Sequence, residues 1–159
     1  MIFLTVGTQL PFDRLVKATD AWAMRFDRDD LFAQIGPSKW RPRHMPCADI
    51  LDPAEFDRRF ASADAIVSHA GVGTMVSAME LGIPLLVMPR RAGLFEHRSD
   101  HQLATAKSFQ NQKHILVAWD ADEIPQRLAQ LSAMSRRQAI SKQVSPGLLS
   151  AIRNFVNAD

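Results

Sequence analysis

Short apolar runs alternate with stretches of helical period along most of the chain. The first run covers residues 2–6 and ends at Gly7, as expected for a strand that is buried on both faces. After Pro11 apolar residues recur every three or four positions with charged residues between them, which is typical of a helix. The same order repeats along the chain: the remaining predicted strands are 31–35, 65–68, 84–88 and 114–118, and the predicted helices are 12–26, 52–63, 71–81, 97–109 and 123–131.

This alternation predicts an α/β fold, a single Rossmann-like domain in which a parallel sheet carries helices on both faces. In such sheets ligands bind at the carboxyl ends of the strands. The segments that follow the predicted strands are therefore the first places to look for a site. They are Gly7-Thr8-Gln9, residues 68–74 and Pro89-Arg90-Arg91.

Composition and length fit one globular domain over 1–159, because 47% of the residues are hydrophobic and 23% are charged. The last part is predicted to form a helix at about 146–158, whose apolar stripe either folds back or docks a partner. A single cysteine, Cys47, predicted in a loop, excludes an internal disulfide and fits a reducing compartment. The net charge of +2 does not argue for nucleic acid.

No apolar run approaches the length of about 18 residues that a membrane span needs. The first residues lack the basic region of a signal peptide, so they are read as a strand. We therefore expect a cytoplasmic protein.

The strongest local motif is Ser68-His69-Ala70-Gly71-Val72-Gly73-Thr74, at a junction between a strand and a helix. Glycines there let the backbone approach a ligand, and the start of a helix attracts phosphate. A plain tight turn remains the alternative. The motif is not a dinucleotide fingerprint, because Val76 replaces the third glycine, and it is not a P-loop.

Four further features each have two interpretations. Glu80 lies seven residues after Gly73, about 10 Å along a helix, where it is either a solvated residue or an acceptor for sugar hydroxyls. His97 and His101 have helical spacing, but no third ligand is obvious, so a pocket border is favoured over zinc. His69 is either a packed histidine or a base. Asp27-Arg28-Asp29 matches a metal-binding pattern of sugar transferases but is better explained as a charged helix end.

The residues 67–74, Glu80-Leu81-Gly82-Ile83-Pro84 and His101-Gln102-Leu103-Ala104 together resemble the C-terminal domain of glycosyltransferase family 28. The opening residues 5–9, with Phe12-Asp13-Arg14-Leu15, are similar to a narrower group. This group contains the small subunits of bacterial exopolysaccharide glycosyltransferases and the catalytic subunit of the dolichol-linked N-acetylglucosaminyltransferase.

The resemblance implies the C-terminal half of a GT-B enzyme, which binds a UDP-sugar and transfers the sugar with inversion to a lipid-linked acceptor. It implies no metal and no cofactor beyond the donor substrate. In the narrower group the other half is a separate, membrane-associated chain that supplies the acceptor side. The length of 159 residues, with no room for a second full domain, fits one such half held at the membrane through its partner.

The resemblance also implies roles for individual residues. The diphosphate would face Gly71, Gly73 and Thr74, with Gly7 and Thr8 close by; Glu80 would contact the ribose, and Arg90 would balance phosphate charge. His69 would lie under the phosphates as a weak candidate base, since the general base is expected on the partner. The full set of expected substrate-binding residues is Gly7, Thr8, Ala70, Gly71, Gly73, Thr74, Glu80, Arg90, His97, His101 and Gln102.

One departure leaves the donor sugar open: family members often carry two glutamines where this chain has His101-Gln102. A non-catalytic nucleotide-binding or scaffolding subunit of a membrane complex remains the alternative function. The basic loop 39–43 either touches the membrane or partner, or is simply solvated.

Overall fold

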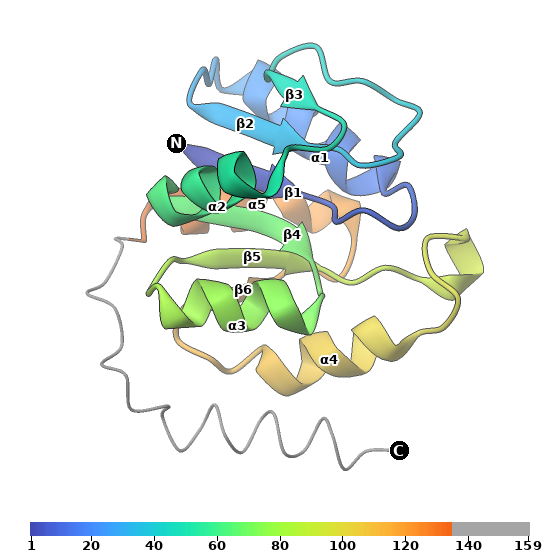
Figure 1. Ribbon diagram of the computed structural model, residues 1–159. Coiled ribbons are helices and arrows are strands. Elements are labelled where there is room, and N and C mark those ends of the chain that lie inside the picture. Colours follow the sequence, from blue (N-terminus) through green and yellow to red (C-terminus); the bar gives the residue numbers. More distant parts are fainter. Residues whose placement is uncertain (135–159) are drawn as a thin grey trace.

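The computed structural model describes residues 1–134, which form one parallel sheet between two helical layers (Figure 1). The six strands lie in the order β3-β2-β1-β4-β5-β6, and every neighbouring pair is parallel. The predicted single α/β domain with a parallel sheet is therefore confirmed. The strands are β1 (Ile2–Thr5), β2 (Leu31–Gln34), β3 (Cys47–Ala48), β4 (Ala65–His69), β5 (Leu85–Met88) and β6 (Ile115–Val117).

In the described part of the chain five α-helices cover the sheet, with α1 and α5 on one face and α2, α3 and α4 on the other (Figure 1). The helices are α1 (Asp13–Arg25), α2 (Pro53–Ser62), α3 (Val72–Glu80), α4 (His101–Phe109) and α5 (Ile124–Ser132), with short 3₁₀ turns η1 (Ala92–Leu94) and η2 (Ala121–Glu123). Within residues 1–134, no helix combines the length and apolar character needed to cross a bilayer.

Side chains that alternate along the strands pack into two separate hydrophobic cores, one on each face of the sheet. In β1, Ile2 and Leu4 join the cluster under α1 and α5, while Phe3 joins the cluster under α2, α3 and α4. In the same way Leu86 faces the first cluster and Leu85 the second. A strand buried on both faces needs apolar residues at every position, which is why these strands appear as continuous runs in the sequence.

The order in which the chain adds strands to the sheet reverses between β1 and β4. From β1 the chain moves outward through β2 and β3, then returns to place β4 on the other side of β1. Thr5 of β1 lies beside Ser68 of β4 at the carboxyl ends of these two strands. The loops that leave β1 and β4 therefore diverge to opposite sides, which opens a crevice at this edge of the sheet.

Local signals set the predicted ends of two helices. The Asp52 carboxylate accepts a hydrogen bond from the Glu55 amide at 3.0 Å, and Pro53 occupies the first turn of α2. Gly82 takes a positive φ of 63°, which ends α3 without the cost that a side chain would bring there.

Two predictions of the secondary structure were wrong. The predicted helix 97–109 begins only at His101, because residues 97–100 form bends that follow the turn at Phe95, whose φ is 57°. Cys47 is not in a loop but belongs to β3, which pairs Cys47 with Ala33 at the edge of the sheet. The helix predicted at about 146–158 lies outside the described residues.

Candidate functional site

A cavity of about 290 Å³ lies at the crevice between the carboxyl ends of β1 and β4. It contains eight of the predicted site residues, which come from four separate segments of the chain. In this way the fold brings the loops after β1, β4 and β5 together with the start of α4. The lining residues are Val6, Gly7, Thr8, Gln9, Leu10, His69, Gly71, Arg90, His97, His101 and Gln102.

The imidazole of His69 lies between two glycines in this cavity. Gly7 has a φ of 76°, and a Cβ placed on it would lie 3.1 Å from His69 Cε1. A Cβ on Gly71 would lie only 2.5 Å from His69 Nε2. Neither position has room for a side chain, so both glycines are required for the ring to occupy this place.

His69 is neutral at pH 7 in this environment. Burial, followed by the nearby charge of Arg90, lowers the pKa of His69 to about 4, although a hydrogen bond with the Thr5 backbone acts in the opposite direction. Such a ring is a weak base at neutral pH, because a general base works best with a pKa near the working pH. An anion bound in the cavity would raise the pKa of His69.

Arg90 forms part of the wall but directs its guanidinium mainly to the protein backbone. Its Nη1 and Nη2 atoms donate four hydrogen bonds of 2.6–2.9 Å to carbonyl oxygens. Burial lowers the pKa of Arg90 to about 10, so the side chain stays charged at neutral pH. Its predicted role in balancing phosphate charge stays a prediction, and its direct contacts give it a second role, the support of the loops.

The other side of the cavity is formed by His97, His101 and Gln102. The two imidazole rings meet edge to face with centroids 4.4 Å apart, although only His101 is in the helix. Burial, then the charges of His101 and Arg90, lowers the pKa of His97. The buried Gln102 accepts a hydrogen bond from the Arg90 amide at 3.2 Å. Within residues 1–134, no group of three or more His, Cys, Asp or Glu side chains is arranged to hold a metal ion.

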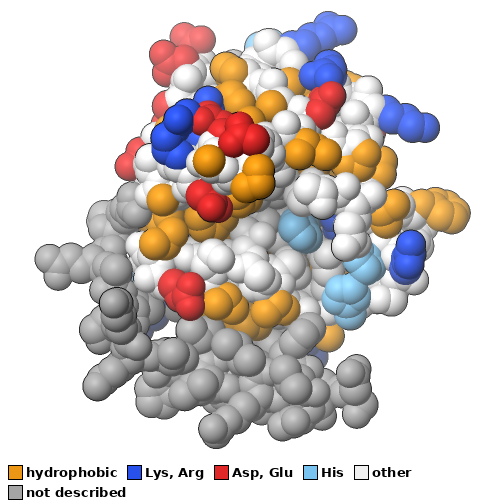
Figure 2. Space-filling model, in the orientation of Figure 1, with side chains coloured by type: hydrophobic (Ala, Val, Ile, Leu, Met, Phe, Trp, Pro, Cys, Tyr) orange, Lys and Arg blue, Asp and Glu red, His pale blue; other side chains and the backbone are white. Residues whose placement is uncertain are grey.

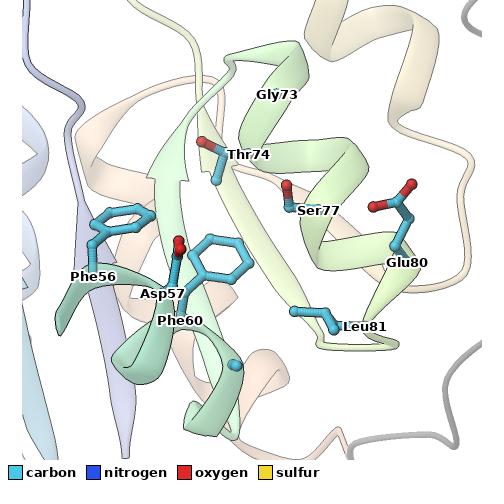
Figure 3. Close-up of a pocket in the computed structure, with 9 residues that line it drawn as sticks. Phe56, Asp57, Phe60, Gly73, Thr74, Ser77, Glu80 and Leu81 are labelled. Atoms are coloured by element: carbon cyan, nitrogen blue, oxygen red, sulfur yellow. The ribbon is translucent and has the colours of Figure 1, made fainter. Parts of the chain in front are cut away.

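A second hollow of about 410 Å³ lies between α2 and α3 (Figure 3). Phe56 and Phe60 of α2 line one side, and Thr74 and Glu80 of α3 line the other. Hydroxyl and carboxylate groups beside aromatic rings suit a ligand with both polar and flat apolar parts. The full lining is Phe56, Asp57, Phe60, Ala61, Gly73, Thr74, Ser77, Glu80 and Leu81.

The predicted site residues are thus divided between two hollows. Gly73, Thr74 and Glu80 line the second hollow, while Gly71 lines the first. Ala70 lines neither, because its side chain is 1% exposed and packs in the core under α2 and α3. Residues that the sequence did not point to also line the hollows; among them Phe56, Asp57, Phe60 and Ser77 lie on helices whose pattern marked only a core face.

The start of α3 lies where the two hollows approach each other. Gly71 is the N-cap of this nine-residue helix, and Gly73 and Thr74 are in its first turn. The unpaired amide groups and the helix dipole make this end attractive to phosphate. On the face of the molecule shown in Figure 2, a group of histidine side chains (pale blue) lies to the right of the centre.

The family model of the glycosyltransferase family 28 C-terminal domain matches residues 1–144. The chain belongs to this family. Both hollows are therefore features of a glycosyltransferase domain. A comparison with curated proteins finds no match.

Solved structures show the same fold at low sequence identity. The solution structure of ALG13 has a TM-score of 0.62 and 15% identity, over 98% of this chain and 94% of that one. The glycotransferase of kitacinnamycin has a TM-score of 0.59 and 13% identity, over 97% of this chain and 37% of that one. The C-terminal CMP-Kdo binding domain of WaaA from Acinetobacter baumannii has a TM-score of 0.54 and 11% identity, over 99% of this chain and 89% of that one. This chain thus spans little more than a third of the length of the kitacinnamycin enzyme, and the fold matches that of GT-B C-terminal halves.

Proposed function

We propose that this family 28 domain binds the UDP-sugar donor in a two-component inverting glycosyltransferase, which acts on a lipid-linked acceptor in polysaccharide biosynthesis. One observation carries the proposal: the start of α3 adjoins both hollows, since Gly71 lines one and Gly73 and Thr74 line the other. A nucleoside diphosphate sugar has its charged groups in the middle and a sugar-containing part at each end. The site has a matching order, because the start of α3 lies between the two hollows.

In the proposed pose the diphosphate lies at the start of α3, against the free amides and the Thr74 hydroxyl. The nucleoside extends along α3, where Glu80 accepts hydrogen bonds from the ribose. The donor sugar lies in the cavity with His97, His101 and Gln102. Each part of the ligand then meets groups of matching polarity.

The chemistry follows from this pose. An acceptor hydroxyl oxygen forms a bond to the anomeric carbon while the bond from that carbon to the phosphate oxygen breaks, and UDP leaves with the electron pair. Negative charge grows on the departing diphosphate, where the dipole of α3 and the Thr74 hydroxyl stabilise it. The acceptor proton needs a base. The acids that line the hollows, Asp57 and Glu80, both belong to the nucleoside side. We therefore assign the base to a membrane-associated partner subunit, through which this chain is held at the membrane.

Binding and transfer are tested separately. The purified chain is melted with UDP, with a UDP-sugar and with ADP as the control. A ligand that binds the native state raises the melting temperature, by an amount equivalent to about 2.7 kcal/mol at a hundredfold excess over Kd. Uridine nucleotides are expected to raise it and ADP is not. If no uridine nucleotide shifts the melt, the donor site is refuted.

Transfer is then measured with a radiolabelled UDP-sugar and membranes that contain or lack the partner. Product is expected only when the chain and the partner are both present. Robust transfer by the chain alone would refute the two-component arrangement. Binding with no transfer or donor hydrolysis in any mixture would favour the alternative, a non-catalytic nucleotide-binding or scaffolding subunit.

A further inference from the structure

The motif Phe12-Asp13-Arg14-Leu15 at the start of α1 has no place in the proposed donor site, yet Arg14 makes a nearly buried ion pair. Its Nε and Nη2 atoms donate to the two carboxylate oxygens of Glu96, each at 2.8 Å. The side chains of Arg14 and Glu96 are only 16% and 9% exposed. Arg14 also contacts Asp120 at 3.0 Å. Such a two-pronged pair fixes both distance and orientation.

Arg90 joins the segments before α1 and before α4 through hydrogen bonds to their backbones. Its guanidinium donates to the carbonyls of Val6 and Leu10 at 2.6 and 2.8 Å, and to those of Pro11 and Glu96 at 2.8 and 2.9 Å. The first three carbonyls belong to the segment between β1 and α1, and the fourth belongs to the segment between β5 and α4. A single side chain therefore bonds the backbones of both segments.

Phe12 and Glu96 complete the connection. The ring of Phe12 is fully buried, with Arg90 at 4.6 Å and Arg14 at 5.6 Å from its centroid. Glu96 also accepts a hydrogen bond from the Arg91 amide at 3.0 Å, so its carboxylate holds its own loop as well as α1. Both cations lie near this apolar ring, while the carboxylate and the carbonyls accept hydrogen bonds from them.

The two segments joined in this way line the cavity at the carboxyl ends of β1 and β4. Residues 6–10 come from the first, and Arg90 and His97 come from the second. Arg14 and Glu96 do not themselves line the cavity. Their effect on a ligand must therefore pass through the positions of these loops.

We propose that Arg14, Glu96 and Arg90 are positioning residues that hold the β1–α1 loop and the β5–α4 loop at a fixed separation around the donor-sugar cavity. The inference deepens the proposed function and rests on it for the identity of the ligand. It assigns a role to the Arg14 motif.

Two conservative variants test the proposal, Glu96→Gln and Arg14→Lys. The first keeps the shape and removes the charge, and the second keeps the charge and removes the fork of donors. The matched control is Asp30→Asn, which weakens the two-pronged Arg28–Asp30 pair next to the amino end of β2, at the opposite edge of the sheet. A second control, Leu128→Ala, lowers stability through the core under α5 at a position outside both loops.

The first readout needs no ligand. Amide and imidazole NMR signals of Thr8, Gln9 and His97 are expected to shift or broaden in both test variants and to stay unchanged in both controls. Unchanged signals in Glu96→Gln and Arg14→Lys would overturn the proposal, even if UDP binding of the wild type had already failed. Equal changes in Leu128→Ala would also overturn it, because the effect would then follow stability alone.

The second readout is UDP-sugar affinity by calorimetry, well below the melting temperature of each variant. We expect a loss of between about twofold and about thirtyfold in both test variants, the range for coupling through residues that do not touch the ligand. The affinity of UDP alone is expected to fall less, because it lacks the sugar that fills this cavity. Equal losses for UDP and the UDP-sugar would contradict a role centred on the sugar cavity.

Discussion

The imidazole of His69 lies so close to Gly71 that a single methyl group on Gly71 would reach within 2.5 Å of Nε2. His69 is the last residue of β4 and Gly71 is the N-cap of α3, so the turn between strand and helix closes around the ring. This contact links the start of α3, the proposed phosphate site, to the floor of the cavity. Several consequences of the site geometry can be measured.

The first concerns Gly71 itself. Gly71→Ala must move either the ring or the helix start, and overpacking of this kind costs about 1–3 kcal/mol. We expect lower stability in urea together with loss of UDP binding. Gly73→Ala is the matched control for stability, because a Cβ there has no atom within 4 Å and replaces a helical glycine. If Gly71→Ala were as stable as the wild type, the close contact would be refuted.

The second concerns pH. Because the pKa of His69 is about 4 in the folded protein against 6.5 ordinarily, the unfolded chain binds more protons between these values. Stability should therefore fall as the pH drops from 6.5 to 4, by at most about 3 kcal/mol from this group. The free energy of unfolding of His69→Gln, measured by denaturation at several pH values, should change less over this window than that of the wild type. A ligand anion should raise the pKa of His69 in imidazole NMR titrations, and an unchanged pKa would remove it from the phosphate site.

The third concerns Gly36, which connects β2 to the following loop. It has a φ of 57°, and a Cβ there would lie 2.6 Å from the carbonyl oxygen of Gly7, in the site loop. Gly36→Ala combines left-handed strain with this clash, and we expect it to cost about 2 kcal/mol or more in urea denaturation. Gly93→Ala has open space around it and should change little. A neutral result for Gly36→Ala would show that the site loop can move freely.

The sequence was sufficient to predict the sheet and the edge that carries the site. Strands buried on both faces appear as continuous apolar runs, as in 2–6, and the motifs after β1 and β4 carry glycines at Gly7 and Gly71, where a Cβ would crowd His69. Both signals are local, so a pattern along the chain contains them.

What the sequence could not show depends on contacts between distant segments. Strand β3 has only two residues, and its pairing of Cys47 with Ala33 leaves no apolar run. The ion pair between Glu96 and Arg14 joins residues 82 positions apart in the chain, so no local pattern records it. Arg90 acts through backbone carbonyls, which no residue pattern records. The division of the site into two hollows likewise follows from how α2 packs beside α3.

The fourth prediction tests the hollow between α2 and α3, where we propose that the nucleoside binds. Glu80 is exposed on α3 and lines the hollow opposite Phe60, about 10 Å along the helix from Gly73. Glu80→Ala should weaken UDP binding by about 1–3 kcal/mol, as expected for lost hydrogen bonds to a bound ligand. Asp122→Ala removes an exposed carboxylate from η2 and should leave the affinity unchanged, which controls for net charge. Calorimetry with UDP and with inorganic pyrophosphate separates the two ends of the site. Glu80→Ala should lower the affinity of UDP and leave that of pyrophosphate as it was. Equal losses for both ligands would place Glu80 at the phosphates instead, and no loss for either would remove it from the site.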